Sequence, residues 1–537
     1  MPLKRLAYML WIVFIALFAA AHAWHLRADF PNFSPWDDWA KYTDEGWYGN
    51  AAIRAHLFGN WYVPGDFNPA PAVPVWPFLQ WVLFFFTGVT VRAARGLAIA
   101  FFFLNLVLSY KLFRDRGPRW VGLLAVTLLA TSPFLYSFSR LAILEPLLVA
   151  LTLIAMNLAI RLPRFRHKEM VAALIGLIFT AMIFTKTTAV FLLPALVWTI
   201  ILPSLHDWRK AARMLVAAGG TAITAFSLWM LLVLNYDLFA DFKYLFFVNA
   251  YEKPHGLWGR LMSFWWSFHG GLWADPILIP LAGLLIAAAL VTRLKNSPRR
   301  LGAAWKPGWT FGLWRDPLFS GAVMIVGGYI GFMTYQNHPQ PRYYVVVAFF
   351  SFFVVVRVMA QLLYQDAPSQ RRTRQAGLAI LAVVCATITF NGVWTLKYVF
   401  HPQYTWVTAA ENLTRYIDQH PNGKRLLVSI SGDEITLITH LQSICDDFGT
   451  EDLPDKLARY QPGWYATWND LDPGTLEDLH THFSLEQVAG FPAFDDPDRN
   501  VLYLFKLHPL PGGQVRIPKG LDLQEVLPDD KIDIDVE

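Results

Sequence analysis

Long apolar runs, each about the length of a membrane-spanning helix, dominate the first 400 residues of the chain. A helix needs about 20 mostly apolar residues to cross the hydrocarbon core of a bilayer. Charged residues make up only 16% of the chain, against about a quarter in soluble domains. The runs therefore predict a polytopic α-helical membrane protein with about eleven spans, at 5–25, 94–113, 119–138, 142–161, 169–185, 188–204, 213–234, 273–292, 317–335, 343–362 and 376–397.

Charge is divided unevenly along the chain. Residues 401–537 carry 24 acidic and 10 basic residues, whereas the first 400 residues carry 16 acidic and 35 basic ones. The basic residues concentrate in every second short connection between the apolar runs, which the positive-inside rule assigns to the cytoplasm. With an odd number of spans the N-terminus is cytoplasmic and the C-terminal part lies outside, by default on the periplasmic side of a bacterial inner membrane. Because membrane topology accounts for the basic charge, no nucleic-acid partner is expected.

Ala21-His22-Ala23 follows the first apolar run and resembles a signal-peptidase site. Cleavage there would leave ten spans with the same sidedness. Retention of the first span is expected, because the run leads directly into a loop with candidate chemistry.

The sequence offers little for a disulfide or a metal. There are two cysteines, Cys385 in an apolar run and Cys445 in the acidic part, and no CxxC or HxxxH spacing. The pair Asp37-Asp38 is too small a signal to assign a metal. A divalent metal is possible but not required, and no metal-binding residue is predicted.

The first outer loop, residues 26–92, combines carboxylates with aromatic residues suited to the membrane interface. Asp44 and Glu45 open the run 44–58, which predicts an interfacial helix with Thr43 as its cap. Acidic residues are common in a first helical turn, because they interact favourably with the helix macrodipole. Taken alone, Asp44 and Glu45 are explained at least as well by this helix-dipole interaction as by a role in a functional site.

Further ionisable residues are predicted at the same membrane face. Ionisable groups at membrane depth are costly and usually face a cavity or a partner. Each also has a structural explanation: Arg140 could pair with Glu145, Lys186 could extend to the interface, and Arg342 could anchor the outer edge. Their convergence on one face nevertheless favours a site, which would contain Arg140, Glu145, Lys186, His338 and Arg342.

Four segments together resemble the GT-C superfamily of membrane glycosyltransferases, in particular the protein O-mannosyltransferases and the lipid A aminoarabinose transferases. They are YTDEGWYGNAA at 42–52, the stretch 77–98 with Arg95, SRLAILEP at 139–146 and FTKTTAVFLLP at 184–194, with a weaker similarity in HPQPRYY. The resemblance covers the first 200 residues well, and it rests on the order and common sidedness of the segments. Two departures stand out: Glu145 replaces a frequent Asp, and NPAPAVPVWP lacks the lysine of the lipid A enzymes, which argues against lipid A as acceptor.

The resemblance implies transfer of a sugar, with inversion, from a polyprenyl-phosphate donor to an acceptor hydroxyl at the outer face of the membrane. Asp44 resembles the family's general base, and Glu45 would orient it or bind the acceptor. Fixed cations in a low-dielectric site would stabilise the departing lipid phosphate. The donor and a glycan, lipid or protein acceptor would be the partners, together with the bilayer. The alternative function is a transporter or flippase of a lipid-linked sugar, although no internal repeat is evident.

The remaining site residues divide into two groups. The cations expected at the donor phosphate are Lys186, Arg342, Arg140 and Arg95. The residues expected at the acceptor or the sugar are Glu145, His338 and Tyr48.

The C-terminal part has the composition of a soluble domain, so residues 1–400 are expected to form the membrane domain and 401–510 a small outer α/β domain. Helices are predicted near 411–420 and 434–444, and strands near 424–431, 463–470, 481–491 and 500–508. Gly432-Asp433-Glu434 is interpreted as a turn at a strand end rather than a second site. The domain is expected to cover the outer cavity or to help admit an acceptor, and 511–537 to be an extended acidic tail.

Overall fold

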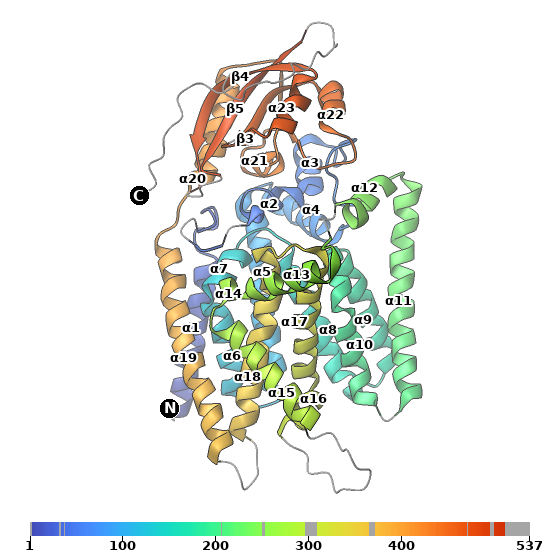
Figure 1. Ribbon diagram of the computed structural model, residues 1–537, viewed down its shortest axis with the longest axis vertical. Coiled ribbons are helices and arrows are strands. Elements are labelled where there is room, and N and C mark those ends of the chain that lie inside the picture. The colour runs from blue at the N-terminus through green and yellow to red at the C-terminus, as the bar shows by residue number, and fades with distance from the viewer. Residues whose placement is uncertain are drawn as a thin grey trace.

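The computed structural model describes residues 3–31, 34–36, 38–205, 207–249, 253–295, 309–364, 371–469, 471–494 and 499–510. A bundle of long helices carries a small sheet-containing domain at one end, here called the domain end (Figure 1). The first helix starts at the opposite end of the bundle from this domain (Figure 1). That placement agrees with an odd number of spans between them. The acidic tail 511–537 and Asp37 lie outside the described residues.

The bundle consists of helices that match the apolar runs of the sequence. Among the described residues, eight helices are long and apolar enough to span a membrane. The count is nine if α6 and α7, which are bent by 66° at their junction, together form one span. The bundle helices are α1 (Leu3–His22), α5 (Val91–Arg114), α6 (Arg119–Thr131), α7 (Pro133–Ser139), α8 (Glu145–Arg161), α9 (Lys168–Ile183), α10 (Leu193–Ile201), α11 (Trp208–Asn235), α15 (Leu278–Lys295), α16 (Trp309–Arg315), α17 (Pro317–Gln336), α18 (Tyr344–Tyr364) and α19 (Arg371–Phe400).

Every one of the eleven predicted spans contains a helix. Nine of these spans hold the eight spanning helices and the α6–α7 pair, with α10 extended by 3₁₀ turns to Thr187–Ser204, and the other two hold α9, with 16 residues, and α15, whose apolar part covers 278–292. The helices outside the predicted spans lie mainly at the domain end, where they connect the bundle to the C-terminal domain (Figure 1). They are α2 (Asp44–Trp47), α3 (Asn50–Phe58), α4 (Val75–Thr87), α12 (Phe239–Lys243), α13 (Gly256–His269) and α14 (Gly271–Ala274).

The helix α18 lies at the centre of the bundle, because its sequence is apolar on every side. It packs against α15, α17, α19 and α6, and almost all of its side chains are buried. A surface helix would instead show one apolar stripe. The tight helix pair α9 and α11 has a different basis: a Cβ on Gly176 would lie 1.9 Å from the Ala218 carbonyl oxygen, so the backbones meet through the missing side chain.

The C-terminal domain has a five-stranded mixed sheet in the order β2-β1-β3-β5-β4. Strands β1 to β3 are parallel, and β5 runs antiparallel to both β3 and β4. The predicted strands and helices are present, with β2, α22 and α23 in addition. The elements are α20 (Thr405–Gln419), β1 (Lys424–Val428), α21 (Gly432–Thr439), β2 (Ser443–Ile444), α22 (Leu453–Tyr460), β3 (Pro462–Trp468), α23 (Pro473–His480), β4 (Phe483–Pro492) and β5 (Val501–Pro509).

Candidate active site

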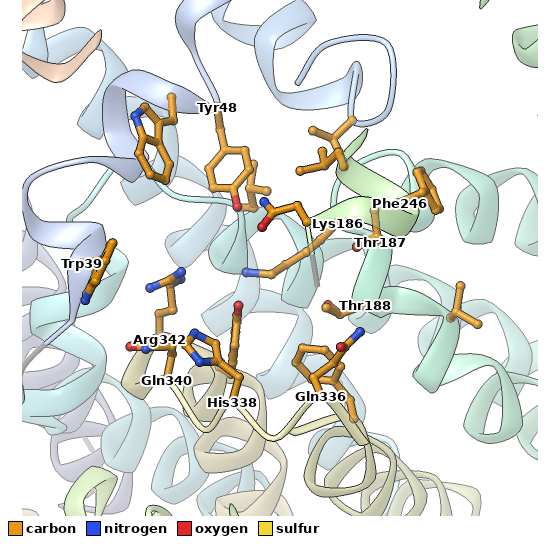
Figure 2. Close-up of a pocket in the computed structure, with 18 of the residues that line it drawn as sticks. Trp39, Tyr48, Lys186, Thr187, Thr188, Phe246, Gln336, His338, Gln340 and Arg342 are labelled. Atoms are coloured by element: carbon orange, nitrogen blue, oxygen red, sulfur yellow. The ribbon is translucent and has the colours of Figure 1, made fainter. Parts of the chain in front are cut away.

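A cavity of about 300 Å³ lies at the domain end of the bundle, where the first outer loop, the α9–α10 connection and the α17–α18 connection meet (Figure 2). Phe448 of the C-terminal domain forms part of its wall. The cavity is therefore bounded by both parts of the chain. Its polar lining residues are Tyr48, Lys186, Thr187, Thr188, Asn249, Gln336, His338, Gln340 and Arg342.

Asp44 is the first residue of the one-turn helix α2 and is 1% exposed. The hydroxyl of Thr43 donates to the Asp44 Oδ1 at 3.2 Å and to the Trp39 carbonyl at 2.7 Å. The Asp44 Oδ2 lies 3.1 Å from the Arg342 Nε. Asp44 is not itself a lining residue of the cavity, but Arg342, its ion-pair partner, and Tyr48, one turn further along, both are.

Arg342 is the middle residue of a short 3₁₀ turn, Pro341–Tyr343, between α17 and α18. Its backbone N–H donates to the Asp38 Oδ2 at 2.7 Å, and its Nη1 donates to the Asp38 Oδ1. Asp38 therefore fixes the arginine by both main chain and side chain. Sequence reasoning did not assign Asp38 a role, because nothing local indicates a partner 304 residues away.

Lys186 lies in extended conformation between α9 and the 3₁₀ helix Thr187–Leu192. Its Nζ donates to the Glu145 Oε1 at the start of α8, and it lies 4.7 Å from the centre of the Tyr343 ring. Lys186 therefore does not extend to the membrane interface, and Glu145 pairs with Lys186 rather than with Arg140. Both structural explanations are wrong. Lys186 is 5% exposed and is directed into the cavity (Figure 2). Thr187 and Thr188, which also line the cavity, follow it directly in the sequence.

Three further candidate residues, Glu45, Arg95 and Arg140, also lie outside the cavity lining. Arg95 donates to both carboxylate oxygens of Glu45, at 2.8 and 2.5 Å, and the Ala142 N–H also donates to Glu45. Arg140 donates to the Tyr136 hydroxyl and to backbone carbonyls near the end of α1. These hydrogen bonds connect the first outer loop to α5 and to the α7–α8 turn. Neither Arg95 nor Arg140 joins Lys186 and Arg342 in the lining of the cavity.

Burial dominates the electrostatics of the site. It raises the pKa of Asp44 to about 6, with Asp38 also raising it and Arg342 and Lys186 opposing. It raises the pKa of Tyr48 well above its usual value. It lowers the pKa of His338 to about 4, assisted by Arg342 and opposed by Asp38. Because desolvation disfavours each charged form, Asp44 titrates near neutrality whereas His338 and Tyr48 are neutral there.

The described part of the chain contains no group of three or more His, Cys, Asp or Glu side chains arranged to bind a metal ion. The carboxylates of Asp38, Asp44 and Glu145 beside the cavity are each paired with a protein cation. The acceptor and sugar assignments of Tyr48, His338 and Glu145 stay predictions. Tyr48 and His338 line the cavity, whereas Glu145 reaches it through Lys186.

Comparison with known proteins identifies a family match over part of the chain. The dolichyl-phosphate-mannose-protein mannosyltransferase family matches residues 69–231, which include Arg95, Arg140, Glu145 and Lys186. No curated protein sequence matches the chain. The match covers less than half of the chain.

Solved structures match nearly the whole chain. The structure of ArnT from Cupriavidus metallidurans in its apo state matches with a TM-score of 0.57 at 13% identity, over 93% of this chain and 98% of that one. Its complex with undecaprenyl phosphate gives 0.57 at 14% identity, over 94% and 99%. The oligosaccharyltransferase AglB from Archaeoglobus fulgidus, in complex with an inhibitory peptide and a dolichol-phosphate, gives 0.50 at 10% identity, over 94% and 74%. The resemblance seen in the four sequence segments is thereby confirmed: the chain has the fold of the GT-C membrane glycosyltransferases.

Proposed function

We propose that the protein transfers a sugar from a polyprenyl-phosphate donor to an acceptor hydroxyl at the outer face of the membrane, with inversion and with Asp44 as general base. One observation carries the proposal: the buried carboxylate of Asp44, whose pKa is raised to about 6, pairs with Arg342, and Arg342 and Lys186 both line one cavity. A base near neutrality and fixed positive charge are what loss of a phosphate leaving group requires.

The reaction balances over these groups. The acceptor oxygen bonds to the anomeric carbon from the face opposite the lipid phosphate, and the bond between that carbon and the phosphate oxygen breaks with both electrons leaving on the phosphate. The hydroxyl proton passes to Asp44. The phosphate gains one negative charge while Asp44 loses one, so the total charge of the site is unchanged. Lys186 and Arg342 stabilise the charge where it develops.

Two features of the surroundings support a lipid-linked donor. The matched ArnT structure contains undecaprenyl phosphate, and the matched AglB structure contains a dolichol-phosphate. In this chain a second, mostly apolar groove of about 720 Å³ lies between α4 and α11, lined by Trp61, Trp81 and Trp229 among others. It adjoins the cavity across the stretch Ala70–Pro74, which contributes residues to both. An apolar groove beside a charged cavity matches a lipid chain attached to a phosphate.

The proposal is tested with purified protein in nanodiscs, a radiolabelled polyprenyl-phosphate sugar and a series of glycan, lipid and peptide acceptors. The expected result is a labelled glycoside together with free polyprenyl phosphate in equal amounts. The same donor in proteoliposomes distinguishes this function from the alternative, a transporter or flippase of a lipid-linked sugar. Donor that crosses the bilayer with its sugar bond intact would identify a transporter.

We expect the rate of transfer to depend on pH through Asp44. Only the carboxylate accepts the proton, so kcat/KM should fall tenfold per unit as pH drops below about 6 and level off above it. The measurement is the pH profile of initial rates with one donor. His338→Gln provides the control: since the pKa of His338 is about 4, its loss should not move the inflection. An inflection near pH 4 in the wild type would contradict Asp44 as the base.

A further inference from the structure

Helix α21 of the C-terminal domain packs directly on the helix that begins with Asp44. The closest approach is at Gly46, where a Cβ would lie 2.2 Å from the Asp433 carbonyl carbon and 2.2 Å from the Glu434 nitrogen. No side chain fits there, so the two helix backbones touch. Figure 1 shows α21 at the lower edge of the C-terminal domain, directly above α2. Gly432-Asp433-Glu434 therefore forms the first turn of α21, rather than only the turn predicted from the sequence.

Asp433 extends this contact to the next helix of the outer loop. Its Oδ1 accepts from Arg54 at 2.8 Å and its Oδ2 accepts from Asn50 at 3.0 Å. Arg54 also donates to Asp66 at 2.7 Å. All four side chains are buried, with Arg54 only 3% exposed. Asn50 and Arg54 lie on α3, which starts three residues after α2 ends at Trp47. The carboxylate of Asp433 therefore fixes α3, while its backbone contacts α2 at Gly46.

Contacts at the two ends of α2 involve the same domain. At the last residue of α2, the indole of Trp47 donates to the Ile430 carbonyl at 3.0 Å. Its ring lies 4.7 Å from that of Phe448, which lines the cavity. Before the first turn, the ring of Tyr42 lies 5.4 Å from that of Trp468. A four-residue helix has too few internal hydrogen bonds to keep its own direction. Its orientation must therefore come from contacts with its neighbours, and these contacts add to those that Arg95 and Arg342 make with Glu45 and Asp44.

We propose that Asp433 is a positioning residue: through Arg54, Asn50 and the contact at Gly46, the C-terminal domain fixes α2 so that the carboxylate of Asp44 stays paired with Arg342, which lines the cavity. This inference rests on the proposed function, because it takes Asp44 to be the base. It gives the C-terminal domain a catalytic reason to be present, since the domain holds the side of α2 opposite to the contacts that Arg95 and Arg342 make with Glu45 and Asp44.

The test compares Asp433→Asn and Gly46→Ala with wild type in the transfer assay. Displacing the base by about 1 Å should lower kcat on the order of 10²-fold in Gly46→Ala and by about tenfold in the isosteric Asp433→Asn. The donor KM should stay within about twofold, because neither residue contacts Lys186 or Arg342. A loss confined to donor KM, or kcat within about twofold of wild type in both variants, would overturn the proposal.

Leu476→Ala is the matched control, because Leu476 is buried in a separate hydrophobic cluster of the C-terminal domain that contains no residue of α2. It should lower the melting temperature of the domain, because it leaves a cavity in that cluster, without lowering kcat at temperatures where the domain stays folded. An equal loss of kcat in Leu476→Ala and Asp433→Asn would mean that domain stability alone matters, and would reject positioning.

Hydrogen exchange separates this inference from the proposed function. Amides of residues 43–50 should exchange faster in Asp433→Asn and Gly46→Ala than in wild type or in Leu476→Ala. If the wild-type protein transfers no sugar, the proposed function fails whereas the exchange data still decide whether α21 orders α2. Unchanged exchange at 43–50 in both variants would refute the ordering itself.

Discussion

Replacing Asp44 with Asn should lower kcat for sugar transfer by about 10³-fold, within the range of about 10²–10⁴ for loss of a positioned general base. Asn matches Asp in shape and keeps the first turn of α2, but it does not take up the acceptor proton. The same change removes one negative charge 3.1 Å from the Arg342 Nε. Binding of polyprenyl phosphate should therefore be unchanged or tighter. The measurements are single-turnover transfer and direct binding of undecaprenyl phosphate.

Asp38→Asn is the informative comparison, because Asp38 also pairs with Arg342 but lies in the turn before α2. It should change binding of the lipid phosphate through Arg342 and lower kcat much less than Asp44→Asn does. If the two variants lose the same factor in kcat with the same change in phosphate binding, both carboxylates act only through Arg342. The role of base would then belong to another group.

Arg342 and Lys186 are both paired with carboxylates before any substrate binds, and this pairing suggests how the donor changes the site. Arg342 contacts Asp38 and Asp44, and Lys186 contacts Glu145, so three carboxylates face two cations. An arriving phosphate competes for the same guanidinium and ammonium groups. As Arg342 turns toward the phosphate, Asp44 loses its ion pair, and with it the charge that lowers its pKa. Donor binding would thus increase the basicity of Asp44.

Much of the fold and part of the site follow from local features of the sequence. Apolar runs mark the bundle helices because the bilayer requires about 20 apolar residues per span, whatever the neighbours are. Lys186 and Arg342 stand out because a charge beside an apolar run has few ways to be satisfied. Both residues line the cavity, as does Tyr48. The composition of the C-terminal part likewise predicts its sheet and helices.

Partner choice, by contrast, depends on contacts between distant segments. Arg140 lies five residues before Glu145 in the sequence, yet Glu145 pairs with Lys186, 41 residues away. Arg95 and Glu45 were expected at the substrates but bind each other. Asp433 resembles any acidic residue at the start of a helix, a position where acids are common for local reasons. Only the packing of α21 on Gly46 distinguishes it.

Replacing Lys186 with Met should have the other large effect, a loss of about 10²–10³-fold in kcat, because it removes a fixed charge from the developing phosphate. Met keeps the length and apolar stem of Lys but no charge. The change also leaves Glu145 buried without its cation, which should cost about 3–5 kcal/mol of stability. A lower melting temperature is therefore expected together with the kinetic loss, and the two effects must be separated.

The double variant Lys186→Met/Glu145→Gln separates them. Gln removes the uncompensated charge, so the melting temperature should recover most of what Lys186→Met loses. Activity should not recover, because the phosphate still lacks its cation. Binding of undecaprenyl phosphate should be weaker than wild type in both variants by a similar factor. Recovery of transfer along with stability would instead mean that Lys186 serves only to neutralise Glu145, and the phosphate would then depend on Arg342 as the cation of the cavity.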